Sequence, residues 1–273
     1  MGDPSQFRFQ TDATAEAYEQ LLVPRLFTPW AERLVSCAAL SRGDCVVDVA
    51  TGPGTVARLA ARAVGKQGSV WATDLSPNML RVARARTAEP GAAEIRFVEC
   101  PADRLVIADG VAHAVFCQQG LQFFPDRSQA LREMHRVLRP GGRVAIAVWG
   151  SLKLNTLFAA WHEALDAAGL TALADLLTAP YSLPDARTVD ELVRGAGFVV
   201  ESVVVEARPL TFEGGMAQAV GGLAATAVGE PLRQASAEAQ ERYVQAAQRA
   251  LAPLLRGDVV QAESSSTVLV AHV

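Results

Sequence analysis

Residues 45–55 have the sequence CVVDVATGPGT, which joins a short apolar run to a glycine-rich bend. The run Cys45–Val49 is almost continuously apolar, a pattern typical of a strand buried on both faces of a parallel sheet. Gly52 and Gly54 follow, and glycine adopts backbone conformations that a Cβ forbids. Apolar residues then recur at helical spacing up to Gly65. The stretch therefore predicts a strand, a tight turn and a helix, the first unit of an α/β fold.

The same alternation continues downstream of this unit. Further strands are predicted at residues 69–73, 95–98, 112–117 and 143–149, and helices are predicted to begin after Ser76 and to span residues 126–138. Ser76 is a suitable cap, and Pro77 suits the first helical turn because it needs no N–H there. Repeated strand–helix units predict a doubly wound, mostly parallel sheet with helices on both faces.

The flanking regions are predicted to be mainly helical. Residues 12–40 are expected to form helices, with Asp12 as a cap, an interruption at Pro24 and a second helix capped by Thr28. After Gly150 the pattern is looser. Helices are predicted at residues 152–178, 188–196 and 216–256, and strands at 198–207 and 267–273. We expect the late helices to form a cap over the sheet and not a separate domain.

Composition excludes several classes of partner. The chain of 273 residues has a net charge of -4 and a pI of about 5.6, so no bulk basic field attracts nucleic acid or an anionic membrane surface. No apolar run approaches the ~18 residues of a membrane helix, and no signal peptide is visible at the start. The four scattered cysteines show no metal-ligand spacing, so we expect no metal and a reducing, cytoplasmic setting. The oligomeric state is left open.

Several polar groups fall at the predicted carboxyl ends of strands, where open α/β sheets bind ligands. A nucleoside triphosphate would require Gly-Lys-Ser/Thr after the bend, and a dinucleotide would require a third glycine and would be repelled by Asp48. S-adenosylmethionine is positively charged, carries no phosphate and suits this pattern better. Asp74, 26 residues after Asp48, can accept hydrogen bonds from the ribose hydroxyls. Two simpler interpretations stay open: the bend is only a tight turn, and Asp74 only helps to cap the next helix.

The motifs resemble those of class I S-adenosylmethionine-dependent methyltransferases, which have a Rossmann-like fold. The matching segments are residues 46–54, 74–80, 117–126 and 136–142, and the resemblance covers about residues 15–150. It is strongest to the branch of quinone-biosynthesis and bacterial natural-product methyltransferases. The resemblance implies a seven-stranded sheet with an antiparallel last strand. It also implies three parts within one domain: helices covering the cofactor site (1–40), a cofactor-binding core (41–150), and a helical cap with the last strands (151–273).

The resemblance further implies the roles of individual residues. Asp48 and the backbone of the bend hold the methionine part, Asp74 holds the ribose, and the remaining residues contact the adenine or the sulfonium end. The implied cofactor residues are Asp48, Ala50, Thr51, Gly52, Gly54, Asp74, Leu75, Met79, Pro101, Ala102, Cys117 and Gln118. The chain departs from the family pattern at Pro101, where an acidic residue is common, and Asp103 is a possible substitute. It departs again at Ala112-His113, where the family often has Phe-Asp.

The acceptor is expected to be a small apolar or aromatic molecule, such as a natural product, methylated at oxygen or carbon. Tyr18, Gln119 and Gln122 are the predicted acceptor-facing residues, and His162 is the predicted general base. Aromatic residues such as Trp161 can line an acceptor pocket or simply pack in the core. One alternative is a protein that binds S-adenosylmethionine without methylating, such as a cyclase or a sensor. Another is an NAD-type oxidoreductase, which Asp48 and the missing third glycine disfavour.

Overall fold

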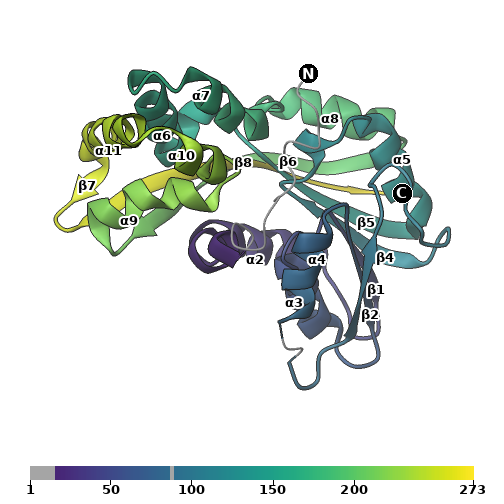
Figure 1. Cartoon of the computed structure of the whole chain (residues 1–273). Coiled ribbons are helices and arrows are strands. Elements are labelled where there is room, and N and C mark those ends of the chain that lie inside the picture. The colour runs from purple at the N-terminus through teal and green to yellow at the C-terminus, as the bar shows by residue number, and fades with distance from the viewer. Residues whose placement is uncertain (1–15, 87–88) are drawn as a thin grey trace.

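The computed structural model describes residues 16–86 and 89–273, so the predicted cap Asp12 lies outside the described residues. Its centre is one twisted sheet with the strand order β3-β2-β1-β4-β5-β8-β6 (Figure 1). The strands are β1 (Cys45–Val49), β2 (Ser69–Asp74), β3 (Glu94–Glu99), β4 (Ala112–Gln118), β5 (Leu138–Trp149), β6 (Val199–Phe212) and β8 (Val259–His272). The pairs among β1 to β5 are parallel, and β8 is antiparallel to both β5 and β6. The predicted doubly wound, mostly parallel sheet is confirmed, with a two-residue strand β7 (Leu255–Arg256) added beside β8.

Helices cover both faces of the sheet (Figure 1). One face carries α2 (Thr28–Cys37) and α3 (Thr55–Val64), with α4 (Pro77–Arg84) beside them, and the other carries α5 (Arg127–Val137) and α8 (Ala186–Gly195). Successive strand residues point to opposite faces. Val46 accordingly belongs to the hydrophobic cluster of α2 and α3, whereas Val47 belongs to that of α5 and α8. The continuous apolar run of β1 is thus explained by burial on both sides.

The helix starts follow the predicted caps in the core but not at the N-terminus. Ser76 caps α4, since its hydroxyl accepts a hydrogen bond from the Met79 N–H at 3.3 Å. The predicted cap Thr28 is wrong, because Thr28 is already helical and Phe27 occupies the N-cap position of α2. The predicted interruption at Pro24 is also wrong: a π-helix, η2 (Tyr18–Phe27), runs through this proline into α2. The wider π turn, with bonds five residues apart, relieves the clash that a proline causes in an α-helix.

The last third of the chain differs most from the predicted boundaries. β6 and β8 have 14 residues each and extend well beyond the predicted strands 198–207 and 267–273. β5 begins at Leu138 instead of Arg143, with a register irregularity opposite Ala112–Ala114. The predicted helical stretches are divided by turns into α6 (Thr156–Ala167), α7 (Thr171–Thr178), α9 (Gly215–Gly221), α10 (Gly229–Gln234) and α11 (Ala237–Leu251). Short 3-10 turns connect several elements: η3 (Leu121–Phe123), η4 (Leu152–Leu154), η5 (Ala179–Tyr181), η6 (Gly222–Ala225) and η7 (Ala252–Leu254).

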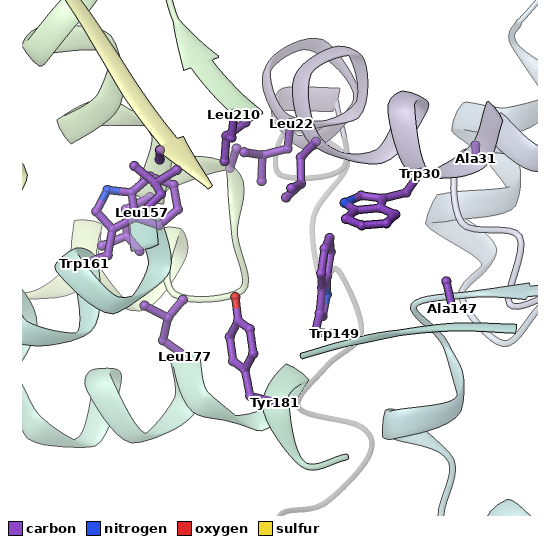
Figure 2. Packing of buried hydrophobic residues seen from close by; sticks show 14 of the residues in the cluster. Leu22, Trp30, Ala31, Ala147, Trp149, Leu157, Trp161, Leu177, Tyr181 and Leu210 are labelled. Atoms are coloured by element: carbon purple, nitrogen blue, oxygen red, sulfur yellow. The ribbon is translucent and has the colours of Figure 1, made fainter. Parts of the chain in front are cut away.

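The cap helices are built on the extension of β6 and β8 (Figure 1). Their apolar residues belong to the same hydrophobic cluster as those of α2 and α3. Figure 2 shows Trp30 of α2 and Trp149 of β5 close together, with Trp161 of α6 deeper in the cap. Trp161 donates its indole N–H to the Ala219 carbonyl at 3.0 Å. These aromatic residues are therefore core residues. Within the described ranges, no helix is both long and apolar enough to cross a membrane.

Candidate functional site

A cavity of about 280 Å³ opens at the carboxyl ends of β1, β2 and β4. This volume is close to the lower end of the range for small-molecule sites. Its wall combines the bend after β1, the ends of β2 and β4, the segment after β3, and helix η2. The topology thus brings the predicted strand-end residues to one rim, as expected for an open α/β sheet.

Asp48 supplies a buried carboxylate at the base of this cavity, with only 1% of its surface exposed. Its Oδ2 accepts hydrogen bonds from the Thr51 hydroxyl at 2.5 Å and from the Ala57 N–H at 3.0 Å. Burial raises the pKa of Asp48 to about 7, although both hydrogen bonds act in the opposite direction. A cation bound in the cavity would favour the charged carboxylate, so Asp48 is suited to a positively charged ligand.

The two glycines of the bend have different functions. Gly52 has a φ of 54°, and a Cβ added there would meet no protein atom within 4 Å. Since Gly52 lines the cavity, that Cβ would occupy space beside the wall. Gly54 has a φ of 83°, but a Cβ there would lie 3.2 Å from the Ala83 Cβ on α4. Gly54 does not line the cavity, and its lack of a side chain permits close packing against α4; its predicted ligand contact stays a prediction.

Asp74 ends β2 and connects the bend to the next helix. Its Oδ2 accepts from the Gly52 N–H and its Oδ1 from the Ser76 N–H, both at 2.8 Å. Burial raises the pKa of Asp74 above its ordinary value. The Leu75 N–H adds a third backbone donor. A carboxylate has about four acceptor positions, so Asp74 can still accept from a ligand hydroxyl. The structure therefore supports the helix-start interpretation of Asp74 and leaves room for the ribose interpretation.

The segment after β3 forms the far end of the cavity. Pro101, Ala102 and Asp103 line it together with Leu75 and Met79, as the predicted adenine region requires. Ala50 and Thr51 also line the wall beside Asp48. Ala50 has a φ of 57°, which is uncommon for a residue with a Cβ and is typical of strained backbone at functional sites.

The end of β4 contributes amide side chains. Gln118 donates its Nε2 to the Phe27 carbonyl and Gln119 donates its Nε2 to the Ser266 hydroxyl, both at 2.8 Å. Both residues line the cavity, and their buried Oε1 atoms have no hydrogen-bond partner within the part of the chain that the structure describes. Two acceptor oxygens thus lie buried next to the cavity without a partner among the described residues.

Two of the predicted residues at the end of β4 lie behind the wall instead of in it. Cys117 is fully buried, and burial raises the pKa of its thiol to about 12, so it packs as a small apolar residue. Gln122 donates to the Gln119 carbonyl at 3.0 Å and supports that segment from behind. The predicted ligand contacts of Cys117 and Gln122 therefore do not follow from the structure.

Helix η2 closes the cavity with Tyr18, Val23 and Phe27. Sequence reasoning identified Tyr18 but missed the other two. Their spacing of five and four residues fits a π-helix, whereas an α-helical pattern pairs Tyr18 with Leu21 and Leu22. Phe123 and Phe124 also line the cavity and were missed, although their position just after a predicted strand was a usable signal.

The predicted base His162 lies on α6 and does not line the cavity. Its predicted catalytic role therefore gains no support from its position. His113 is at the opposite end of β4, where its Nδ1 accepts from the Cys45 N–H at 3.1 Å. Within the described residues, no group of three or more His, Cys, Asp or Glu side chains is arranged to hold a metal ion.

Comparison of the sequence with protein families gives a match to the ubiE/COQ5 methyltransferase family over residues 16–211. A ubiquinone/menaquinone biosynthesis C-methyltransferase UbiE of Azotobacter vinelandii is 30% identical over 181 residues, which are 62% of this chain and 71% of the relative. The corresponding protein of Marinomonas sp. (strain MWYL1) is 34% identical over 118 residues, or 43% of this chain and 47% of the relative. The match thus spans about half the length of the Marinomonas protein.

Solved structures share the fold at lower identity. Phosphoethanolamine N-methyltransferase 2 of Haemonchus contortus, in complex with S-adenosyl-L-methionine, has a TM-score of 0.61 and 20% identity, covering 100% of this chain and 60% of that one. An S-adenosylmethionine-dependent methyltransferase of Aquifex aeolicus has a TM-score of 0.52 and 19% identity, covering 75% of this chain and 93% of that one. At such identities the likeness concerns the fold.

Proposed function

This chain belongs to the ubiE/COQ5 methyltransferase family, and on that premise we propose that it transfers the methyl group of S-adenosylmethionine to a small apolar or aromatic acceptor. One observation carries the proposal. The buried carboxylate of Asp48, the half-buried carboxylate of Asp74 and the open space beside Gly52 occupy a single cavity wall.

The residues of the wall fit S-adenosylmethionine. The ligand has a sulfonium and an ammonium, which suit the buried Asp48 carboxylate. Its ribose hydroxyls suit Asp74, and its adenine suits the end lined by Leu75, Met79 and Ala102. No phosphate has to be placed near the two carboxylates. The proposal thus uses the charge of the cavity as well as its shape.

When bound, S-adenosylmethionine supplies a methyl group that is already activated by the sulfonium. The chain then has to bind, orient and exclude water. Hydrogen bonds from Thr51 and Ala57 hold the Asp48 carboxylate in place, so this group need not move when a cation binds. Val23, Phe27 and Phe124 present apolar surface to the same cavity and keep water from the reacting atoms. Orientation of two bound reactants can supply roughly 7–11 kcal/mol of the barrier.

The acceptor is proposed to be a neutral apolar or aromatic molecule, such as a natural product, methylated at oxygen or carbon. Support comes from the apolar side chains of η2 and of Phe123 and Phe124 in the wall. Tyr18 and the amide of Gln119 add polar groups that can hold an acceptor hydroxyl. The proposal includes no nucleic acid partner, which agrees with the acidic net charge of -4. A reducing cytoplasm is also proposed, supported by four free cysteines.

The test is a turnover assay with S-adenosylmethionine that carries an isotopically labelled methyl group. The chain is incubated with a panel of phenols, quinols and apolar ring compounds, and labelled products are identified by mass spectrometry. Transfer of label to an acceptor, with formation of S-adenosylhomocysteine, supports the proposal. Tight binding of the donor without transfer to any acceptor would favour a cyclase or a sensor, and absence of donor binding would overturn the cofactor assignment.

A further inference from the structure

Arg58 on α3 lies between two segments of the cavity wall without lining the cavity itself. Its Nη1 donates a hydrogen bond to the carbonyl of Pro53, in the glycine bend, at 2.6 Å. Its Nη2 lies 3.6 Å from the Glu19 carboxylate, in the first turn of η2. One guanidinium therefore contacts both the cofactor bend and the helix that closes the cavity.

Glu19 is unusually placed for an acidic residue, because only 6% of its surface is exposed. Arg86 also approaches it, at 3.2 Å, but the Arg86 side chain is about half exposed. The Glu19 Oε2 atom is buried without a hydrogen-bond partner among the residues described. Burying a carboxylate is costly unless it is paired, so Glu19 is retained at a free-energy cost that its Arg partners offset.

The other end of η2 is also connected to the cavity. The Phe27 carbonyl accepts from Gln118 Nε2, and a carbonyl can only accept, so the amide of Gln118 must turn its nitrogen to η2. Its oxygen is buried and has no hydrogen-bond partner among the described residues. Helix η2 is thus attached at both ends to residues that, under the proposed function, hold the donor, while Tyr18, Val23 and Phe27 face the cavity between them.

We propose that Arg58 is a positioning residue that couples donor binding to the seating of η2, by holding the Pro53 carbonyl of the bend and the Glu19 carboxylate of the helix together. This inference rests on the proposed function, since it requires the donor to occupy the cavity. Coupling of this kind is reciprocal: a bound donor orders η2, and a seated η2 strengthens donor binding. Arg58 suits the task because its planar group presents several donors in fixed directions.

The test compares Glu19→Gln and Arg58→Gln, singly and together, with Arg86→Gln as the matched control. Arg86→Gln also removes a positive partner of Glu19, but it leaves the contact with the bend intact. Two quantities are measured: the dissociation constant of S-adenosylhomocysteine by calorimetry, and hydrogen exchange of residues 18–27 with and without that ligand. Exchange of β1 in the same molecules, together with the melting temperature, reports whether each variant is folded.

We expect S-adenosylhomocysteine to slow exchange in η2 of the wild-type chain and of Arg86→Gln. In Glu19→Gln and Arg58→Gln the protection of η2 should be lost, and affinity should fall about tenfold, within the range seen for coupled neighbours. The double variant should be no worse than Arg58→Gln alone. A purely structural role would change melting and the exchange of β1 but not the ligand-dependent protection of η2.

Three results would overturn the inference. If folded Arg58→Gln shows the same ligand-dependent protection of η2 as the wild type, no coupling passes through Arg58. If Arg86→Gln loses as much protection and affinity as Arg58→Gln, only the charge near Glu19 matters. If Arg58→Gln is unfolded, Arg58→Lys serves instead, because it keeps the charge but cannot span both contacts; full coupling in that variant contradicts the proposal. If the wild-type chain does not bind S-adenosylhomocysteine, the proposed function fails as well, and this outcome is distinguishable from the others.

Discussion

The sheet has a cavity at the carboxyl ends of its parallel strands and a cleft at the opposite ends, and the two differ in charge and burial more than in size. The cavity at the carboxyl ends measures about 280 Å³ and the cleft at the opposite ends about 350 Å³. In the opposite cleft, His113 lies 3.5 Å from Asp44, and His272 lies 3.1 Å from Glu201. Each acid there faces a basic side chain, and most of these groups are partly exposed.

The carboxyl-end cavity is arranged differently. Asp48 and Asp74 are both acidic, Asp48 is buried and Asp74 is half-buried, and burial raises the pKa of each. The amide oxygens of Gln118 and Gln119 add further acceptors without partners in the described part of the chain. Perturbed carboxylates and unpaired acceptors indicate a site that awaits a cationic ligand, whereas paired groups indicate a surface that is already satisfied.

The largest expected effect comes from Gly52→Val, which should abolish binding of S-adenosylhomocysteine. The new side chain would project into space beside the cavity wall, at a φ of 54°. Gly141→Val is the matched control, since Gly141 lines the opposite cleft, has a φ of 74° and also has open space at its Cβ position. Both variants should lose stability from backbone strain, but calorimetry should find binding lost only in Gly52→Val. Equal affinities in the two variants would contradict the assignment of the cavity.

The next largest effect is expected from Asp74→Ala. We expect donor affinity to fall by roughly 1.5–3 kcal/mol, because hydrogen bonds to a charged group are lost and the Gly52 N–H loses its partner. Asp44→Ala, in the opposite cleft, should leave affinity unchanged. Titration calorimetry on both variants checks this. An unchanged dissociation constant in Asp74→Ala would leave Asp74 with a helix-capping role alone.

The pH dependence of binding should be set by Asp48, whose pKa is about 7 in the ligand-free protein. Affinity for S-adenosylhomocysteine should rise with pH up to about 7, by at most tenfold per unit, because the ionised carboxylate binds the cationic ammonium. Stability of the ligand-free protein should change in the opposite direction. Because the pKa of Asp48 is higher in the folded than in the unfolded chain, Asp48 contributes to the free energy of unfolding below its unfolded pKa. This contribution is lost as the pH rises through about 7.

Asp48→Asn is the control for the pH dependence of both the affinity and the stability. Affinity measured from pH 5 to 7 should become flat in this variant, and the corresponding part of the stability change should disappear. A slope that persists in Asp48→Asn would assign the titration to another group in the cavity.

The smallest effects are expected outside the cavity. His162→Ala should retain turnover, because His162 does not line the cavity. Arg143→Gln breaks a partly exposed pair with Glu201 and should cost about 0–1 kcal/mol of stability without changing donor affinity. Turnover with labelled donor checks the expectation for His162→Ala, and thermal melting checks the stability of Arg143→Gln. Loss of turnover in His162→Ala at unchanged donor affinity would restore the predicted base.

Local sequence patterns were enough to predict the central unit and the side of the cavity proposed to bind the cofactor. β1, the bend, the Ser76 cap and the placement of Asp48 and Asp74 at strand ends all follow from local rules. Apolar runs encode buried strands, glycine permits a bend, and a hydroxyl caps the helix that follows it. Each of these signals acts within a few residues, so it can be recognised without knowing the rest of the chain.

Tertiary structure alone decided the rest of the site and the extent of the last strands. The polar run Ser264–Thr267 lies buried in β8, where Trp30, Asn155 and Gln119 bond to it from 234, 110 and 147 residues away in the chain. The orientation of Gln118 depends on the Phe27 carbonyl, and the burial of Glu19 depends on Arg58. A polar residue is read as exposed unless its partner is known, and here the partners are distant in sequence and become neighbours only when the chain folds.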